Sequence, residues 1–349
     1  MAKHPYLPEP VRRRVRRKPW LQHLLWRVEA ALLGLLWGVL GRLSPDRASR
    51  LGRALGRRLG PRLQKSAHVR QNLRMALPHL CDEEHEALVP EVWGSWGAML
   101  AEMPHLERIA REASSRIELH VKGELRALHE PGRPVVLVTA HTSNQQVATI
   151  AAARLGLPLT GVYSADSNPY VARRVARFRR ALRCRLLERK GSARALVREL
   201  SRGGAIGIVG DHRFDSGEPM PFFGSPTFVS TAPARLALRH GCELLPVRVE
   251  RTEGARFRVT IFEPLHPGDP QAPLRERAHR MTQALVAHFE RWFREDPTEW
   301  LCTSRRWPKS MPPEPRDACA SHGAPEASGE MRGGEEAAGP RRVAGRRGG

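Results

Sequence analysis

The spacing of apolar residues changes near Pro131 and divides the chain into two parts. Between residues 44 and about 111, apolar residues recur every three or four positions, as on one face of a helix. Ser44-Pro45-Asp46 has the residues of a helix start and precedes leucines at positions 51, 55 and 59. We therefore predict a helical segment before the first strands of a sheet.

After Pro131, short apolar runs typical of strands alternate with helical stretches. The predicted strands are Pro134–Thr139, Leu157–Tyr163, Arg185–Glu188 and Ala205–Gly210, followed by a hairpin of Leu244–Arg251 and Arg256–Phe262. The predicted helices are Gln145–Leu155, Pro169–Leu182, Ala193–Arg202 and Arg275–Phe293. Because such alternation favours parallel strands covered by helices, we predict an α/β fold with a mixed, mostly parallel sheet flanked by helices.

The first 43 residues combine a basic arm, residues 1–19, with an apolar helix that contains Trp26 and Trp37. The charge-free core of this helix, Ala30–Gly41, is about twelve residues long, whereas a spanning helix needs roughly 20. We predict a helix that lies in or dips into the cytoplasmic leaflet, held by apolar insertion and by the basic arm. A helix buried in the protein core and a cleaved secretory signal are the alternatives.

Charge narrows the choice of partners. Lys and Arg number 58 against 36 Asp and Glu, a net charge of +22, which favours anionic partners such as nucleic acid, anionic lipid or an acidic protein. The final stretch, residues 311–349, is rich in Gly, Pro, Ala and charge, and we predict that it is disordered. Residues 44–310 then form the folded domain.

The cysteines are scattered, with no C-x-x-C pair and no histidine at the spacing of a zinc site. They are Cys81, Cys184, Cys242, Cys302 and Cys319. This pattern favours a reducing compartment without structural zinc, and we expect neither a metal nor a cofactor in the chemistry.

A histidine stands at the end of one predicted strand. His141 comes directly after the buried run that ends at Thr139, and a helix is predicted to start soon after it. Ligands of open α/β sheets bind at the carboxyl ends of the strands, where a neutral imidazole can remove a proton from an alcohol. A hydrogen-bonded loop histidine without a chemical role is the alternative.

A second predicted strand end offers both an acid and a base. Asp211, His212 and Arg213 follow the run 205–210, and an aromatic loop with Phe222 and Phe223 comes next. The two phenylalanines are either core residues or the lining of an acyl-chain groove. Asp211 and Arg213 are candidates for positioning a substrate.

The order of these motifs resembles the bacterial lipid A biosynthesis late acyltransferases, the lauroyl and myristoyl type of the lysophospholipid acyltransferase-like superfamily. The likeness rests on the His loop, the Asp loop, P-F-F-G and the helix T-x-P-A-x-L-A-L-R at Thr231–Arg239, with outlying motifs at Asn72–Pro78 and Arg305–Trp307. It implies that residues 44–310 are an acyltransferase domain. It also implies acyl carrier protein as the acyl donor, a glycolipid hydroxyl as the acceptor, and residence at the cytoplasmic face of the cell inner membrane.

By this resemblance, His141 is the base of the family motif H-x-x-x-x-D/E, and Asn144 matches an asparagine often found within it. The acidic position falls on Gln146, which can accept a hydrogen bond from the imidazole but carries no charge. Three interpretations are open: an active enzyme with a displaced acid, for which Asp166 and Asp211 are candidates, a weak enzyme, or a lipid-binding homologue that does not acylate. We predict an active enzyme in which Gln146→Glu raises activity or leaves it unchanged.

Arginines near the predicted site fit anionic substrates. Residues 172–183 hold six arginines, among them Arg180, which we predict to bind substrate. Acyl carrier protein is acidic and lipid A precursors carry phosphates, so a basic surface serves both. A nucleic-acid-binding protein is the rival from charge alone, but aromatic residues make up only 6% and no RNA- or DNA-binding motif occurs, so we expect no nucleic-acid partner. Without G-x-S-x-G, the sequence does not fit a serine hydrolase of that type.

Overall fold

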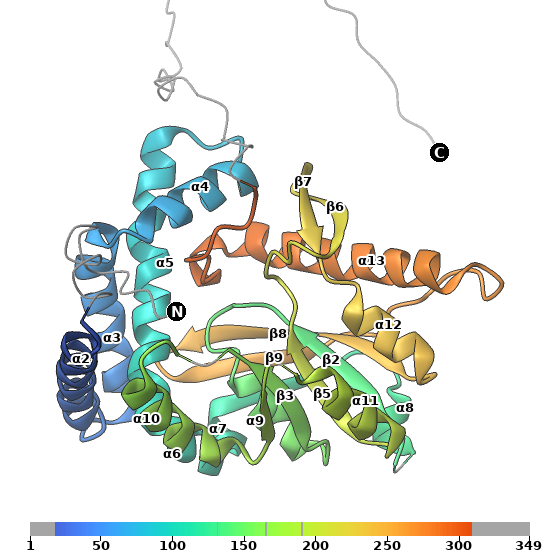
Figure 1. Cartoon of the computed structure of the whole chain (residues 1–349), viewed down its shortest axis with the longest axis horizontal. Coiled ribbons are helices and arrows are strands. Elements are labelled where there is room, and N and C mark those ends of the chain that lie inside the picture. Colours follow the sequence, from blue (N-terminus) through green and yellow to red (C-terminus); the bar gives the residue numbers. More distant parts are fainter. Residues whose placement is uncertain (1–17, 131, 165, 190, 309–349) are drawn as a thin grey trace, which may run out of the picture.

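A computed structural model describes residues 18–130, 132–164, 166–189 and 191–308. Most of the predicted basic arm and the whole predicted tail lie outside these ranges. The centre of the fold is a seven-stranded sheet of order β1-β9-β8-β2-β5-β3-β4 (Figure 1). Its strands are β1 Ile117–Val121, β2 Val135–Thr139, β3 Leu159–Tyr163, β4 Arg185–Glu188, β5 Ala205–Val209, β8 Glu243–Glu253 and β9 Arg256–Ile261.

The sheet is mixed and mostly parallel, as predicted. Only β8 and β9 pair antiparallel, through the expected hairpin, while the other neighbours in the sheet run parallel. All five residues of β2 are buried because this strand lies between β8 and β5 and is covered on both faces. Such a strand needs apolar side chains on both sides, which explains the continuous run Val135–Val138.

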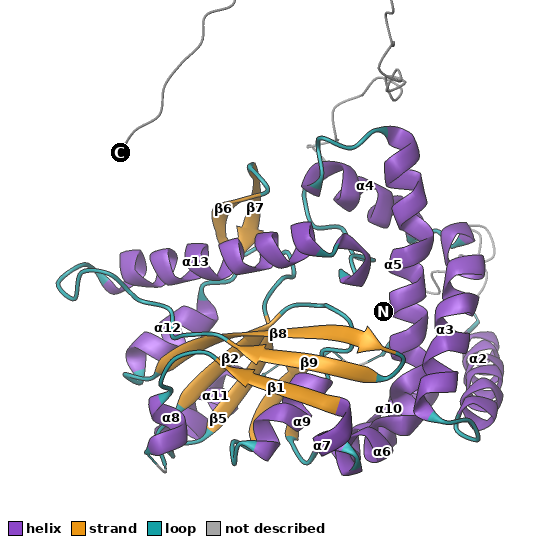
Figure 2. Ribbon diagram, turned by 180° about the vertical axis from the view of Figure 1, so that it is seen from behind, coloured by secondary structure: helices purple, strands orange, loops and turns teal. Residues whose placement is uncertain are grey.

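Helices cover both faces of the sheet (Figures 1 and 2). One face packs against α6 Leu106–Arg111, α7 Ala113–Arg116, α9 Val147–Arg154 and α10 Pro169–Arg179. The other packs against α11 Ala193–Ser201, α12 Ala232–Arg239 and α13 Leu274–Glu295. Three short helical pieces, α8 Arg126–His129, η3 Arg180–Leu182 and η4 Pro297–Glu299, join these elements. The predicted helices of this region are confirmed, with ends that differ by a few residues.

Two features were not predicted. Strand β1 was missed because only one of its five residues is fully buried, so its apolar pattern is weak. The aromatic loop is in fact a two-stranded antiparallel hairpin, β6 Glu218–Phe222 and β7 Ser225–Val229. Three of its residues are prolines, which are tolerated in a ribbon with free edges but argue against a strand when only the sequence is known.

The predicted N-terminal helix is α2 Pro19–Leu40, the one helix in the described part of the chain that is long and apolar enough to cross a membrane. It is not a core helix. Trp37 and Leu40 at its end are buried, but Trp20 is 64% and Leu35 69% exposed. The side-chain amide of Asn168, at the start of α10, donates to the Trp26 carbonyl at 2.9 Å, so α2 is joined to the domain along part of its length.

Helices α3 Pro45–Leu59 and α5 Asp82–Glu102 pack closely at one side of the sheet, with η1 Gly60–Arg62 and α4 Ser66–Ala76 beside them (Figure 2). Glycines allow the approach. A Cβ at Gly52 would meet the Gly97 carbonyl, and one at Gly56 would meet the Trp93 carbonyl. This contact fixes α5 against α3. The short helix η2 Met103–His105 then connects the end of α5 to α6.

Candidate functional site

His141 lies just beyond the carboxyl end of β2, in the loop that leads to α9. Ser143 in this loop has a φ of 50°, in the left-handed region, and this turns the chain sharply after the strand. The side chain of His141 remains 23% exposed, whereas Ala140, Thr142 and Ser143 around it are buried. The imidazole of His141 is therefore accessible, whereas the residues on either side of it are not.

The register of two neighbouring strands brings an acid to His141. Strands β2 and β5 run parallel with Thr139 opposite Val209, so residues two positions beyond each meet at the same edge. His141 Nδ1 and Asp211 Oδ1 are 2.6 Å apart. The His141 backbone N–H donates to the same oxygen at 3.1 Å, and the Trp300 indole N–H donates to Asp211 Oδ2 at 3.4 Å. Asp211 is thus held on both oxygens and fixes the imidazole through Nδ1.

Opposite charges stabilise the His141–Asp211 pair. Burial alone would lower the pKa of His141, but the charge and hydrogen bond of Asp211 outweigh it and raise that pKa above its ordinary value. Burial would raise the pKa of Asp211, but the His141 imidazolium holds it well below its usual range. The carboxylate therefore stays charged at neutral pH and favours the protonated imidazole. Asp211 thus stabilises the positive charge that the His141 imidazole acquires when it accepts a proton.

A second layer of contacts holds the loop. The segment after α13 runs beside it: Leu301 N donates to the His141 carbonyl at 2.8 Å, and Ser143 N donates to the Glu299 carbonyl at 2.9 Å. From α5, Glu102 accepts from the Asn144 amide at 2.9 Å and pairs with Arg251 of β8. The loop is thereby connected to three parts of the chain that are remote in sequence.

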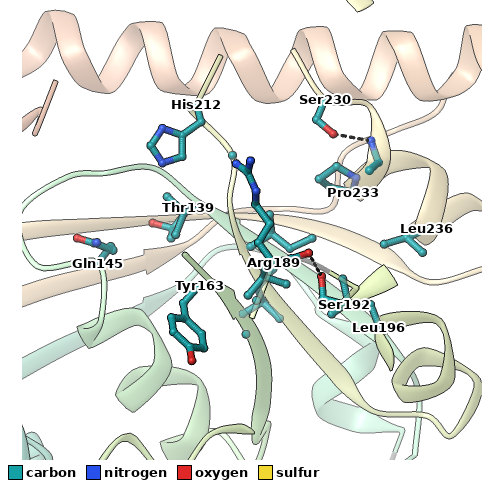
Figure 3. Close-up of a pocket in the computed structure, with 18 of the residues that line it drawn as sticks. Thr139, Gln145, Tyr163, Arg189, Ser192, Leu196, His212, Ser230, Pro233 and Leu236 are labelled. Carbon is teal, nitrogen blue, oxygen red and sulfur yellow. Dashed lines mark hydrogen bonds between the residues drawn. The ribbon is translucent and has the colours of Figure 1, made fainter. Parts of the chain in front are cut away.

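A cavity of about 840 Å³ opens beside His141 (Figure 3). Strands β3 and β5 pair only as far as Gly161 and Gly207, which are opposite each other, and the two strands have no further pairs beyond this point. Both glycines line the cavity, and the side chains of Leu186 and Leu159 lie close to the positions that a Cβ would take there. Most of the remaining wall is apolar and includes Leu159, Leu182, Leu186, Leu196, Leu236 and Phe289. The cavity has the size and character of a site for an extended apolar group.

Gln146, the predicted motif partner of His141, takes part in a different set of contacts. Its side-chain oxygen accepts from Arg179 Nε at 3.0 Å, and its amide nitrogen lies 3.0 Å from the Met103 sulfur. It lies at the start of α9 and shares the cavity wall with His141, but no hydrogen bond joins the two in the described part of the chain. The acid that contacts His141 is Asp211, one of the two candidates for a displaced acid.

The other predicted site residues are distributed around the cavity and away from it. Asn144 is buried and makes the contact with Glu102 described above. Arg180 is exposed in η3 and does not line the cavity, whereas its neighbour Arg179 does. Arg213 donates to the Trp307 carbonyl at 3.0 Å and pairs with Asp215.

Phe222 and Phe223 belong to an aromatic cluster of the core and not to the cavity wall. Phe222 is fully buried, and its ring contacts Phe293, Trp300 and Trp307. This cluster packs under Trp300 and so supports the residue that holds Asp211. Of the two possibilities for the phenylalanine pair, the structure favours the core.

Three residues of the site were not singled out from the sequence. Trp300 is 89 positions from Asp211, and Arg179 and Arg189 were indistinguishable from the other arginines around them. His212 was noted only as a base at the strand end. Among the described residues, no group of three or more His, Cys, Asp or Glu side chains could hold a metal ion, and no serine or cysteine is hydrogen-bonded to His141.

Gln146→Glu is now expected to have a small effect on the chemistry. The new carboxylate would pair with Arg179, which already donates to position 146, and would not reach the imidazole. We expect kcat within about threefold of the unmodified protein and an unchanged acidic limb of the pH–rate profile, since that limb reports His141. Steady-state kinetics from pH 5 to 9 test this expectation, and an acidic limb moved to higher pH would show that position 146 does act on the histidine.

Comparisons with known proteins identify the family of this chain. The model of a family described as bacterial lipid A biosynthesis acyltransferase matches residues 17–309. A phosphatidylinositol mannoside acyltransferase from Mycolicibacterium smegmatis is 26% identical over 194 residues, which cover 54% of this chain and 61% of that protein. The chain thus spans about three fifths of the length of this curated relative. A crystal structure of the 1-acyl-sn-glycerophosphate acyltransferase from Thermotoga maritima matches 76% of this chain and 97% of its own, with 14% identity and a TM-score of 0.34.

Proposed function

Because the chain belongs to the bacterial lipid A biosynthesis acyltransferase family, we propose that it transfers a fatty acyl group from acyl carrier protein to a hydroxyl group of a lipid A precursor or a related glycolipid. The observation that carries this proposal is the His141–Asp211 pair, 2.6 Å apart at the mouth of a largely apolar cavity. The pair supplies a base for the hydroxyl, and the cavity supplies room for the acyl chain.

The reaction proceeds by direct attack on the thioester. His141 Nε2 takes the proton of the acceptor hydroxyl while its oxygen attacks the carbonyl carbon, and the charge of Asp211 stabilises the imidazolium that forms. When the tetrahedral intermediate collapses, the carbon–sulfur bond breaks. The imidazolium then returns its proton to the thiolate, so the products are an ester and a free thiol.

The interpretation of a homologue that binds lipid without acylating it rested on the missing charge at Gln146. Asp211 provides that charge from another strand, which supports the active enzyme with a displaced acid. The imidazole is oriented and its cation stabilised, as general-base catalysis requires. We propose that the protein is catalytically competent.

We place this reaction at the cytoplasmic face of the inner membrane. The apolar side chains that α2 exposes would insert into lipid, and the arginines of α10 beside it would meet anionic headgroups. Arg174 of α10 lies directly against Gly34 of α2, so the basic helix and the apolar helix form one surface. The acceptor, itself a membrane lipid, would then reach the cavity without leaving the bilayer.

A transfer assay with paired donors and acceptors tests the proposal. The full chain in phospholipid vesicles would receive dodecanoyl groups from acyl carrier protein or from coenzyme A, with a lipid A precursor or a phosphatidylinositol mannoside as the acceptor. We expect the lipid A precursor to gain the mass of one acyl group, and only with the carrier-protein donor. Exclusive use of coenzyme A would refute the donor, exclusive acylation of the mannoside would refute the acceptor, and no transfer from any thioester would refute the activity.

A further inference from the structure

A second imidazole lies against His141 and has no role in the reaction described above. The ring centroids of His141 and His212 are 4.2 Å apart, with planes inclined at 54°. His212 follows Asp211 at the end of β5, and its ring projects over the cavity (Figure 3). Within the described ranges no hydrogen bond engages either nitrogen of this ring. His212 thus brings an exposed imidazole to the cavity wall, in contact with the base.

The charge state of His212 follows from the groups that face it. Desolvation in the cavity, and then the neighbouring His141 cation, lower the pKa of His212, while Asp211 opposes them. Arg306 and Arg189 add to the lowering. Two imidazolium rings in contact would repel each other, so the cation that forms on His141 during the reaction keeps His212 neutral. A neutral imidazole is a very weak acid, but it carries one N–H that can donate a hydrogen bond.

On the basis of the proposed function, we propose that His212 is a catalytic residue whose N–H donates a hydrogen bond to the carbonyl oxygen of the acyl thioester. When the acceptor oxygen bonds to the carbonyl carbon, the carbonyl π electrons move to this oxygen, and the hydrogen bond strengthens. When the carbon–sulfur bond breaks, the carbonyl re-forms, and the proton held on His141 passes to the sulfur. His212 exchanges no proton in either step.

The arrangement suits this role better than a second acid or base. The two rings lie side by side, so His141 can face the attacking oxygen and His212 the carbonyl oxygen that becomes negative. Such a donor acts where charge develops, and loss of one donor typically costs about 10²–10³ in kcat.

Substitutions at His212 separate this role from a structural one. In His212→Ala we expect kcat to fall by about 10²-fold or more. The KM for dodecanoyl–acyl carrier protein should stay within about threefold, because the hydrogen bond matters mainly in the transition state. The acidic limb of the pH–rate profile should not move, since the His141–Asp211 pair is untouched. His212→Asn and His212→Gln place an amide N–H near the positions of Nδ1 and Nε2, and at least one of them should recover tenfold or more of the loss.

Several results would contradict the proposed role of His212. Activity of His212→Ala within threefold of the unmodified protein, a rise in KM without a fall in kcat, or failure of both amide variants to recover activity would overturn the proposal. A displaced acidic limb would mean that His212 only supports the His141–Asp211 pair and would overturn it as well. His120→Ala is the matched control, because this exposed histidine of β1 does not line the cavity, and we expect its kcat to stay within threefold. If His141→Asn abolishes transfer while His212→Ala does not, the role of His212 fails and the acyl-transfer function stands.

Discussion

Asp211→Asn is expected to lower kcat on the order of 10³–10⁴, the scale seen when the acid behind a catalytic histidine loses its charge. The amide has nearly the shape of the carboxylate and can still meet the Trp300 indole or the His141 N–H. Without a charge, however, it cannot stabilise the imidazolium, and if its oxygen keeps both bonds from His141, its NH2 group faces the Trp300 N–H and cannot accept from it. The loss should appear in kcat and kcat/KM together, since the interaction is made mainly in the transition state.

The direction of the pH shift provides a second measurement. The acidic limb reports the pKa of His141, because only the neutral imidazole accepts a proton. Asp211 raises that pKa, so its removal should move the acidic limb to lower pH. Asp166→Asn is the matched control, since this is the other acid that the sequence offered and no hydrogen bond joins it to His141 among the described residues. Full activity of Asp211→Asn, or equal losses in the two variants, would contradict the assignment.

Replacement of His141 is expected to remove the activity by about 10²–10⁴-fold, the usual worth of a general base. His141→Ala also leaves the Asp211 carboxylate, only 5% exposed, without its cationic partner. We expect a loss of about 3 kcal/mol in the free energy of unfolding for this variant, because removal of one member of a buried pair leaves a charge uncompensated.

His141→Asn separates the two effects. Its amide can donate to Asp211 from nearly the position of Nδ1, but asparagine cannot serve as a base. We expect the same loss of transfer with a smaller loss of stability, as measured by chemical denaturation. If His141→Asn retained more than a tenth of the activity of the unmodified protein, the histidine would not be the base.

The sequence predicts the fold in this protein because β2 is buried on both faces and β3 and β5 contain no exposed residue. Continuous apolar runs such as those that became β2 and β5 stand out against arginine-rich helices, and the alternation of the two leads to a parallel sheet. Two elements were not predicted from the sequence. Strand β1 lies at the edge of the sheet and is mostly accessible, and the β6–β7 hairpin contains prolines.

The sequence predicts individual residues of the site, but it does not predict which of them contact one another. His141 and Asp211 were each placed at a strand end, yet the motif assigned Gln146 as the partner because it lies near in sequence. The true contact depends on the order of the strands, in which β5 lies directly beside β2, and on the pairing of Thr139 with Val209. Local patterns do not encode such an order, and they say nothing about Trp300, which reaches Asp211 from the end of the domain.

The glycine contact between α3 and α5 has a consequence for inherited variation. Any missense change at Gly52 or Gly56 adds at least a Cβ, and each would collide with a main-chain carbonyl of α5, which cannot move aside as a flexible side chain can. Alleles of this kind would reduce the number of folded molecules in the cell and not the turnover of each molecule that folds. A screen that scores only cellular phenotype would group them with substitutions at His141, although a low protein level with normal specific activity distinguishes them.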